Sequence, residues 1–515
     1  MSALSTRAPA PAARPVRDGV LLPLVGLLAA LVSLAGAWRP SLWTDEAATI
    51  SAAGRDPADL WRMLQHLDAV HGLYYAAAHV WTAVAGTSEL ALRAPSAVAV
   101  GVAAVGVLVL ARRLAGPGPV PLLAAAAFAL LPRVTWAGAE ARSSAAATAL
   151  AVWATVLLVR ALDRHRRGPW IAYTACAATG CVLNVYLLLL LAAHGTTLVL
   201  RRGTARRDRL AWLACAAAAA LVTSPVLLLA RRQSGQLGDA HLGPVELAVR
   251  VVVNQFFLGE TPTVVGAPGR GTDWWRPAAV ALAVLGWALV AVALARAARG
   301  PAGARRTALW ALPWLVLPTA VVAGYSLVSA PLHNARYFAF CTPALALLLG
   351  SGLAALGRRP RAVVAALAVL LVVPVLASQR QPDAKSGADW AQVAQYLCRN
   401  ASPGQAVYFG ARRAPVDGVV TLTTRAVSVA YPRCFTGLED VTLLAPATEV
   451  GDLTGRSRPL GESLDRLAGH DTVWVVRRPG DATVAADDAV LAAAGFARGR
   501  QWTGTLDEVV EFTRR

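Results

Sequence analysis

The chain has 515 residues, of which 56% are hydrophobic and only 15% are charged, and its mean hydropathy is +0.50. Soluble proteins carry about 25% charged residues, and here the apolar residues form long blocks, so the sequence indicates a polytopic membrane protein rather than a soluble one. The formal charge of +19 comes from arginine clusters between the apolar blocks. An excess of arginine in the short connections between spans is typical of the cytoplasmic loops of membrane proteins. It explains the positive charge without nucleic-acid binding, so we predict no nucleic-acid partner.

The chain begins with a polar segment that leads into the first apolar run. Residues 1–18 are rich in Ala, Pro and Arg, and we predict that they form a disordered, cytoplasmic N-terminus. The run at about 19–37 ends in Ala35-Gly36-Ala37, which is like a signal-peptidase site. Because the run is long for a signal peptide and many apolar segments follow it, we predict an uncleaved first membrane helix.

Residues 38–90 form a long connection that is rich in acidic and aromatic residues. We predict a structured outer loop, with short helices around 56–67 and 71–85 lying on the membrane surface. The loop opens with Ser41-Leu42-Trp43-Thr44-Asp45-Glu46-Ala47-Ala48-Thr49, which places two adjacent carboxylates at the edge of the bilayer. Such a pair is either the solvated start of a loop or part of an active site.

Ten further apolar segments follow, and we predict a helical transmembrane domain of about eleven spans over residues 19–379. If the N-terminus is inside, the short, strongly basic connections all fall in the cytoplasm, as the positive-inside rule requires. The loops that hold the acidic, histidine and aromatic residues then fall outside. The ten segments lie near 92–111, 117–132, 143–162, 169–184, 185–200, 210–230, 277–297, 307–328, 337–357 and 361–378.

Residues 380–515 lose the membrane character, and we predict that they form a small extracytoplasmic α/β domain. Strands are expected around 407–409 and 473–476, and helices around 386–399 and 483–495. The segment contains no nucleotide-binding motif. Its two cysteines, Cys398 and Cys434, are either disulfide-bonded, which an extracytoplasmic location favours, or two unpaired buried thiols.

The side chains that could carry chemistry all fall in the predicted outer loops. Asp68 and His71 are three residues apart and share a face if that stretch is helical; a histidine with only a local hydrogen-bonding role is the commoner alternative. Glu140 and Arg142 lie at the outer start of a span, where ionisable groups are costly and suggest function. The alternative is that they form an ion pair.

A further group, His333, Arg336 and Tyr337, lies at the outer end of another span. The planar guanidinium of Arg336 suits the oxygens of a phosphate group, whereas contact with lipid headgroups is the alternative. Carboxylates, arginines and histidines on one side of a helical bundle predict a membrane enzyme or transporter with an outward-facing anion site. An anionic lipid whose tail enters between helices would fit it.

Five stretches, taken in order, resemble the GT-C glycosyltransferases that use polyprenyl-phosphate sugars, with a pattern similar to the protein O-mannosyltransferases of glycosyltransferase family 39. The resemblance covers roughly residues 20–360, and the composition fits an actinobacterial member. There are two departures from the pattern of many relatives, which have His-Pro-Pro where this chain has His71-Gly72-Leu73 and an aromatic residue or proline in place of Ser143. The stretches are Trp43-Thr44-Asp45-Glu46-Ala47, Asp68-Ala69-Val70-His71-Gly72-Leu73-Tyr74-Tyr75, Leu92-Arg93-Ala94-Pro95-Ser96, Glu140-Ala141-Arg142 and Arg336-Tyr337.

The resemblance implies transfer of a sugar, with mannose first and arabinose next, from a polyprenyl-phosphate donor to a hydroxyl group, with inversion. Asp45 corresponds to the general base that deprotonates the acceptor, and Glu46 to a residue that orients the acceptor or supports the loop. The expected partners are the lipid donor, membrane lipids and an extracytoplasmic glycan, lipid or protein acceptor.

The other roles that the resemblance implies concern the donor and the loop. Arg142 and Arg336 are expected at the donor phosphate, with Tyr337 and His333 beside it. A second set, expected at the substrate or in the loop, comprises Asp68, His71, Tyr74 and Glu140. The sequence requires no cofactor, although Glu46, Asp68 and His71 have oxygen and nitrogen donors that would suit Mg, Mn or Zn.

The alternative function is a lipid or polysaccharide transporter of the cell envelope. It would share the helical bundle but predicts ionisable residues at mid-membrane depth and related, broken helices. Both functions place the chain in the cell membrane as a multi-pass protein, with its N-terminus in the cytoplasm and its C-terminal region outside.

Overall fold

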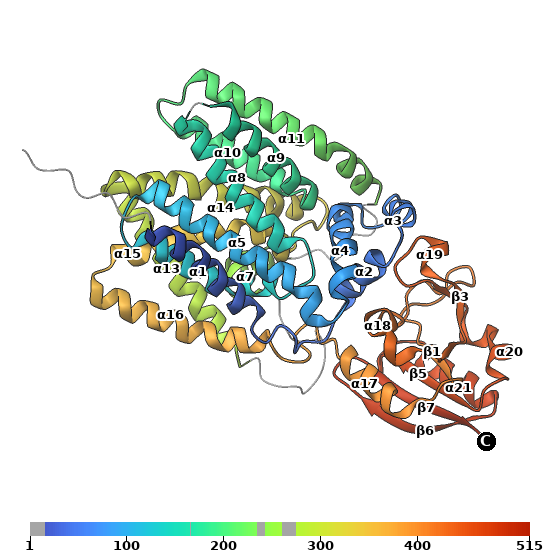
Figure 1. Cartoon of the computed structure of the whole chain (residues 1–515). Helices are drawn as coiled ribbons and strands as arrows, with labels where there is room; N and C mark the ends of the chain where they lie inside the picture. The colour runs from blue at the N-terminus through green and yellow to red at the C-terminus, as the bar shows by residue number, and fades with distance from the viewer. Residues whose placement is uncertain (1–15, 165, 234–242, 260–273) are drawn as a thin grey trace, which may run out of the picture.

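The computed structural model describes residues 16–164, 166–233, 243–259 and 274–515. Most of the predicted disordered N-terminus, residues 1–15, therefore lies outside the described residues, and the first helix begins at Val16. The described chain forms a bundle of apolar helices and, at one end of it, a smaller region with a β-sheet (Figure 1).

Each of the eleven predicted apolar segments is helical in the described chain, which confirms the helical membrane fold. Among the described residues, seven helices are long and apolar enough to cross a membrane, or eight if α6 and α7 count as one span that is bent by 61°. The shorter apolar helices Gly19–Leu34 and Leu187–Leu200 occupy two of the remaining segments, and α9 occupies the third. The bundle contains α1 (Val16–Leu34), α5 (Glu89–Ala115), α6 (Val120–Leu130), α7 (Pro132–Gly138), α8 (Ser144–Arg164), α9 (Arg167–Leu183), α10 (Leu187–Leu200), α11 (Arg206–Arg232), α12 (Pro244–Val249), η3 (Arg250–Leu258), α13 (Arg276–Arg299), α14 (Ala302–Val328), η4 (Ala335–Cys341), α15 (Thr342–Ala355) and α16 (Arg358–Ser378).

The break between α6 and α7 has a local cause. Leu131 is extended, with φ −60° and ψ 126°, because the ring of Pro132 disfavours helical geometry in the residue before it. The chain therefore turns sharply, and α7 ends just before the Glu140-Ala141-Arg142 motif. This turn brings the motif to the end of the bundle where the first loop lies.

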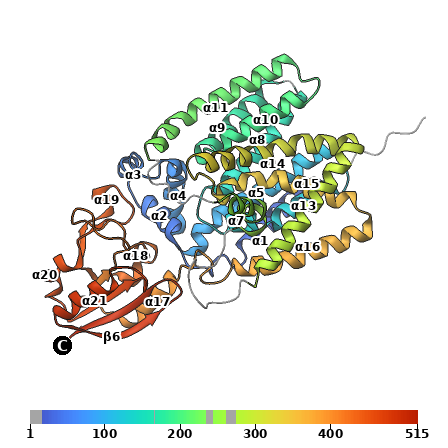
Figure 2. The ribbon, with the colours of Figure 1, turned by 180° about the vertical axis from the view of Figure 1, so that it is seen from behind.

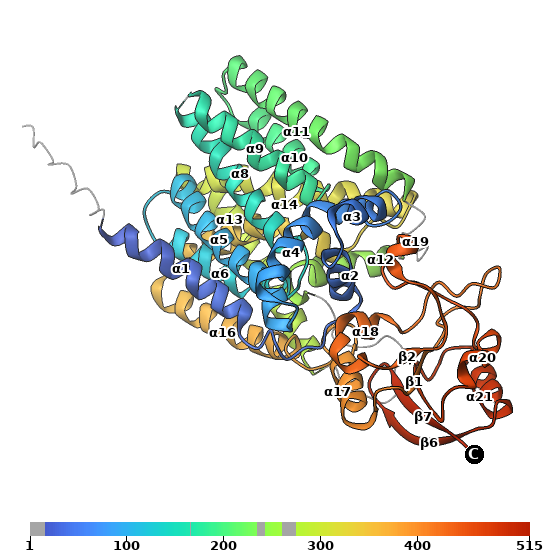
Figure 3. The same cartoon turned by 45° about the vertical axis from the view of Figure 1, so that its right-hand side comes forward.

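That first loop is structured, as predicted. It contains α2 (Thr44–Ala53), α3 (Pro57–Leu64), η1 (Ala69–His71) and α4 (Gly72–Ala85). The start of α3 is fixed by the Asp56 side chain, which accepts hydrogen bonds from the amides of Ala58 and Asp59, and by Pro57 in the first turn. These helices lie between the bundle and the C-terminal region, which Figure 3 shows from the side.

α5 and α8 end, and α14 begins, at the end of the bundle away from the loop helices α2, α3 and α4, which Figure 2 shows beside the C-terminal region. Asp163 lies 4.0 Å from Arg113 and 3.4 Å from Arg306, so three connections that are distant in sequence share one ion-paired cluster. This grouping is what the predicted sidedness of the arginine clusters requires.

Residues 380–515, here called the C-terminal region, contain a five-stranded sheet in the order β2-β1-β5-β7-β6. β1 runs parallel to β2 and β5, while β7 is antiparallel to β5 and β6. The elements are α17 (Trp390–Asn400), β1 (Ala406–Phe409), α18 (Ala426–Ala430), η5 (Pro432–Phe435), β2 (Glu439–Asp440), β3 (Leu443–Ala445), α19 (Ala447–Val450), β4 (Arg456–Ser457), η6 (Leu460–Glu462), α20 (Leu464–Leu467), β5 (Thr472–Arg477), α21 (Val484–Ala493), β6 (Phe496–Thr503) and β7 (Glu508–Arg514).

The strands predicted around 407–409 and 473–476 are confirmed as β1 and β5. The helix predicted from residue 386 is wrong at its start, because Ser386 and Gly387 have φ of 53° and 78° and α17 begins only at Trp390. Of the two alternatives for the cysteines of this region, the structure has the disulfide: Cys398 of α17 is bonded to Cys434 of η5.

Candidate functional site

Asp45 stands where three distant parts of the chain meet. It lies in the first turn of α2, and its carboxylate pairs with Arg142, at 3.1 Å, and with Arg336 of η4. The three side chains keep 18%, 11% and 21% of their surface exposed, respectively. The structure thus brings together the predicted base and both arginines predicted to bind the donor phosphate.

The charge of Asp45 is set by these two neighbours. Burial alone would raise the pKa of Asp45, but the positive charges of Arg142 and Arg336 outweigh burial and hold the pKa well below its usual range. The hydroxyl of Thr49 donates to the backbone oxygens of Asp45 and Ala141, each at 3.1 Å, so α2 is tied to the arginine-bearing segment. The carboxylate is therefore ionised and held in place.

Glu46 points away from this cluster and has a different environment. Arg93 of α5 donates to both of its oxygens, at 2.8 and 2.5 Å, and the amide of Ala141 donates to Oε1 at 3.0 Å. Both side chains of the Glu46–Arg93 pair are fully buried. Through these contacts Glu46 ties α2 to α5 and to the segment that carries Arg142.

A hydrogen-bonded chain extends the cluster toward Asp68. The hydroxyl of Tyr75 accepts from Arg142 at 2.9 Å and donates to Asp68 at 2.6 Å. Tyr75 was not among the predicted site residues, although it stands in the motif that holds Asp68 and His71. Asp68 therefore helps to orient Arg142 through Tyr75.

The two other predicted residues of this loop have lesser roles in the geometry. His71 packs beside Tyr75 with ring centroids 5.8 Å apart, and burial, together with the charge of Arg142, lowers the pKa of His71 to about 4. It is neutral near pH 7 and carries no cationic charge there. Tyr74 packs with the small apolar cluster around Ala52 and Met63, so it is a packing residue.

Two aromatic rings hold Arg336 in position. Its guanidinium lies 5.4 Å from the ring centroid of Trp43 and 5.5 Å from that of Tyr337. Tyr337 in turn stacks on Tyr186 at 5.8 Å. The predicted neighbour of the phosphate, Tyr337, thus supports an arginine of the site.

His333 is not brought to the cluster. Its Nε2 is 3.2 Å from the side-chain oxygen of Gln255, and its ring stacks on Phe338 at 5.2 Å. Burial, with the charge of Arg250 adding to it, lowers the pKa of His333 to about 4. Its ring contacts Gln255 of η3 and Phe338, and its place beside the donor phosphate stays a prediction.

Glu140 is buried near a lysine that sequence reasoning missed. Lys385 follows α16 and places its ammonium 3.9 Å from the ring centroid of Trp136. Within the described chain, Nζ of Lys385 and Oε1 of Glu140 have no hydrogen-bond partner. Burial raises the pKa of Glu140 and, against its carboxylate neighbours, lowers that of Lys385 to about 8. Lys385 is the single lysine of the sequence, and this rarity could have marked it as a candidate site residue.

The described residues offer no ready metal site. No group of three His, Cys, Asp or Glu side chains that could hold an ion occurs among them. Glu46, one of the three candidates, is occupied by Arg93. The set of Glu46, Asp68 and His71 therefore does not fit a metal, and no step is assigned to one.

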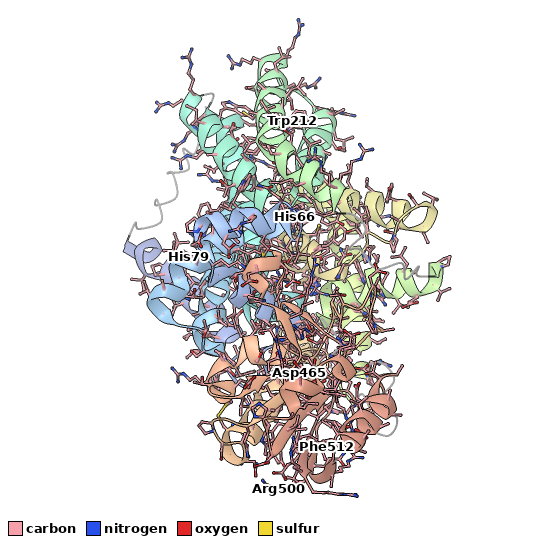
Figure 4. All side chains as sticks on the ribbon, turned by 90° about the vertical axis from the view of Figure 1, so that its right-hand side faces the viewer. His66, His79, Trp212, Asp465, Arg500 and Phe512 are labelled. Atoms are coloured by element: carbon pink, nitrogen blue, oxygen red, sulfur yellow. A yellow bond between two sulfur atoms is a disulfide. The ribbon has the colours of Figure 1, made fainter. Side chains whose placement is uncertain are left out.

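The site and the loop are flanked by the bundle and the C-terminal region. Figure 4 shows His66 and His79 of the loop between α11, where Trp212 is labelled, and the C-terminal region, where Asp465, Phe512 and Arg500 are labelled. Arg142 stands just before α8 and Arg336 just before α15, so the charged cluster lies at the end of the bundle where these two helices begin.

Comparisons with known proteins agree with this architecture. Residues 73–229 match the family model described as dolichyl-phosphate-mannose-protein mannosyltransferase. No curated protein matches the chain in sequence. The fold is similar to that of ArnT from Cupriavidus metallidurans, both bound to undecaprenyl phosphate (TM-score 0.54, 15% identity, 97% of this chain and 98% of that chain) and in the apo state (TM-score 0.57, 15% identity, 96% and 98%).

A further similar structure is the arabinofuranosyltransferase AftD from Mycobacteria, with a TM-score of 0.50 and 18% identity, covering 97% of this chain and 42% of that chain. The predicted resemblance to GT-C glycosyltransferases is thereby confirmed, and the chain has the multi-pass membrane fold of that group. At these identities the structural likeness concerns the fold, and the chemistry must be judged from the side chains.

Proposed function

We propose that the chain is a membrane glycosyltransferase that moves a sugar from a polyprenyl-phosphate donor to an acceptor hydroxyl outside the cytoplasm. The observation that supports this most directly is the carboxylate of Asp45 between Arg142 and Arg336. A base beside two phosphate-binding groups is what such a transfer needs. The family model over residues 73–229 and the undecaprenyl phosphate bound to ArnT support the same class of donor.

In the proposed reaction Asp45 takes the proton of the acceptor hydroxyl while the acceptor oxygen forms a bond to C1 of the sugar. The bond between C1 and the phosphate oxygen breaks, and its electron pair leaves with the polyprenyl phosphate. Arg142 and Arg336 stabilise this leaving phosphate through charge-assisted hydrogen bonds. Attack opposite to the leaving group inverts the configuration at C1.

The ion pairs of Asp45 suggest how the base becomes active. With both arginines on its oxygens, Asp45 is a weak proton acceptor, because its pKa lies well below its usual range. A donor phosphate would compete for the same guanidinium groups and weaken their hold on the carboxylate. The pKa of Asp45 would then rise when the donor binds, which is when a base is required.

Mannose is the first candidate sugar, on the family model, and arabinose is the second, on the similarity to AftD. The transporter alternative has less support, because the charged cluster lies at the end of the bundle. We further propose that the N-terminus lies in the cytoplasm and the C-terminal region outside, since the arginine-rich connections group at the opposite end from the site.

The test is an assay of purified protein with polyprenyl-phosphate mannose and, separately, polyprenyl-phosphate arabinose, followed by mass spectrometry of glycan and lipid products. Asp45→Asn is expected to lower kcat by about 100- to 10,000-fold, since that is the usual contribution of a general base. Asp59→Asn is the matched control, because Asp59 lies in the same loop but pairs with Arg62 at 2.8 Å. Equal transfer rates for Asp45→Asn and wild type would contradict the assignment.

A further inference from the structure

The segment that leads into α2 is held by residues of the C-terminal region. The amide of Leu42 donates to the hydroxyl of Tyr431 at 2.8 Å, and the amide of Ala391 donates to the hydroxyl of Ser41 at 2.9 Å. The amide of Ser41 donates to the backbone oxygen of Pro382 at 2.8 Å. Two consecutive residues of the loop are thus fixed by three hydrogen bonds from separate parts of the C-terminal region.

The same segment shares an apolar core with the C-terminal region. Leu42, Trp43 and Ala47 are buried in one cluster with residues of α17, β1, α18 and η5, and α18 packs on α2. The start of the loop is therefore part of the same folded core as the C-terminal region. The residues that the C-terminal region contributes to this apolar cluster include Trp390, Val393, Leu397, Val407, Phe409, Val427, Ala430 and Phe435.

The hydroxyl of Tyr431 also joins the two ends of the loop. While it accepts from Leu42 at the start, it donates to the carboxylate of Glu89 at 2.9 Å, and Glu89 is the first residue of α5. A single hydroxyl therefore connects residues 42 and 89 across the whole first loop. Its loss would remove one hydrogen bond at each end of the loop.

The disulfide lies beside these contacts. Cys398 belongs to α17, the helix that contains Ala391, and Cys434 follows Tyr431 by three residues. The bond therefore cross-links the two segments of the C-terminal region that hold Ser41 and Leu42.

We propose that the C-terminal region is a positioning part of the active site, in which Tyr431, with the disulfide beside it, fixes Leu42 and through it Asp45. This inference rests on the proposed function of Asp45. Asp45 follows Leu42 by three residues, so a change in the position of Leu42 is passed to the first turn of α2. A displacement of about 1 Å in a catalytic group can cost about 100-fold in rate.

The test compares Tyr431→Phe with Tyr408→Phe. Tyr408 is the matched control, because its buried hydroxyl also donates to a carboxylate, that of Asp487 at 2.9 Å, but within the C-terminal region only. We expect Tyr431→Phe to lower kcat by about tenfold, with the donor KM changed by less than about twofold. Tyr408→Phe should keep the wild-type kcat, even if both variants melt at a lower temperature.

Hydrogen–deuterium exchange gives a readout that does not depend on activity. The peptide that covers residues 41–49 should exchange faster in Tyr431→Phe than in wild type or Tyr408→Phe, since Leu42 loses its acceptor. If Tyr431→Phe does not fold, Ser41→Ala tests the neighbouring contact, because it removes the hydroxyl that accepts from the amide of Ala391, and it should also lower kcat. Wild-type kcat and exchange in the folded variant would overturn the inference.

The two proposals fail in different ways. If Asp45→Asn is as active as wild type, the proposed base is wrong, whatever Tyr431→Phe does. If Asp45→Asn is inactive while Tyr431→Phe has the kcat and the exchange rate of wild type, only the positioning role is wrong. Replacing Cys398 and Cys434 by serine together should reproduce part of the Tyr431→Phe effect, and an unchanged kcat would exclude the disulfide from this role.

Discussion

Asp45 and Glu46 are adjacent in sequence and both pair with arginine, yet their two surroundings differ in every other respect. The Glu46–Arg93 pair is fully buried, and a backbone amide adds a further hydrogen bond to Glu46. The Asp45 pairs with Arg142 and Arg336 keep between 11% and 21% of each side chain exposed. Neighbours on a helix point in different directions, so one turn of α2 serves two purposes.

The difference separates a structural ion pair from one that can exchange partners. A buried charge that loses its partner is left uncompensated in a low-dielectric environment, so the Glu46–Arg93 pair must stay intact in the folded protein. A partly exposed pair can open toward an incoming anion at smaller cost. The contrast teaches that accessibility of the pair, rather than the presence of a carboxylate, distinguishes the candidate base.

The largest expected effect comes from breaking the buried pair. Arg93→Ala should lower the free energy of unfolding by about 3–5 kcal/mol, because Glu46 would keep its charge without a partner. Thermal melting in detergent measures this. The control in the same helix is Arg113→Ala, whose exposed pair with Asp163 should contribute less than about 1 kcal/mol. Similar melting of the two variants would contradict the contrast.

A smaller effect is expected when Arg336, which pairs with Asp45, is replaced by a residue of the same charge but a different shape. Arg336→Lys retains a cation but not the planar fork that binds phosphate oxygens in pairs. We expect the donor KM to rise by about tenfold, with little change in melting temperature. Arg250→Lys, at an exposed pair with Glu246, serves as the control and should leave the KM unchanged. An unchanged KM for Arg336→Lys would remove Arg336 from the donor site.

The smallest expected effect is a shift in pH dependence. In the free protein the arginines hold the pKa of Asp45 well below its usual range, and a bound phosphate would weaken that effect. The acid limb of kcat, which reports the donor complex, should therefore lie at a higher pH than the acid limb of kcat/KM, which reports the free protein. Coincident limbs would mean that the donor does not displace the arginines.

The same lowered pKa has a consequence for stability with a defined sign. A carboxylate whose pKa is lower in the folded than in the unfolded state stabilises the fold above the unfolded pKa, about 3.9 for Asp. That contribution is lost as the pH falls from there through the folded pKa. Asp45→Asn should therefore reduce the pH dependence of melting only below about pH 4.

The sequence predicts the helical bundle well, because the bilayer requires long apolar segments and each of these is readable in the chain. It also indicates Asp45, Arg142 and Arg336 as candidates. It cannot predict that Asp45 meets Arg336, since 291 residues separate them and only the packing of η4 on the loop brings them together.

Other residues show where local patterns mislead or fall short. His333 is close to Arg336 in sequence, but the 3-10 helix that begins at Ala335 places the two side chains on different neighbours. Arg93 was readable as a charge within an apolar helix, which signals a partner or a function. The hydrogen bonds from Arg142 to Tyr75 and from Leu42 to Tyr431 could not be predicted from the sequence, because both depend on tertiary contacts.

Lys385 gives the chain a natural chemical reporter. Because it is the single lysine and is buried between the bundle and the C-terminal region, its amine is shielded while the two stay packed. Amine-reactive esters should therefore modify this side chain only when the junction opens. Mass spectrometry of one modified peptide would then measure how often the C-terminal region separates from the site, and whether a lipid donor or reduction of the disulfide changes that frequency.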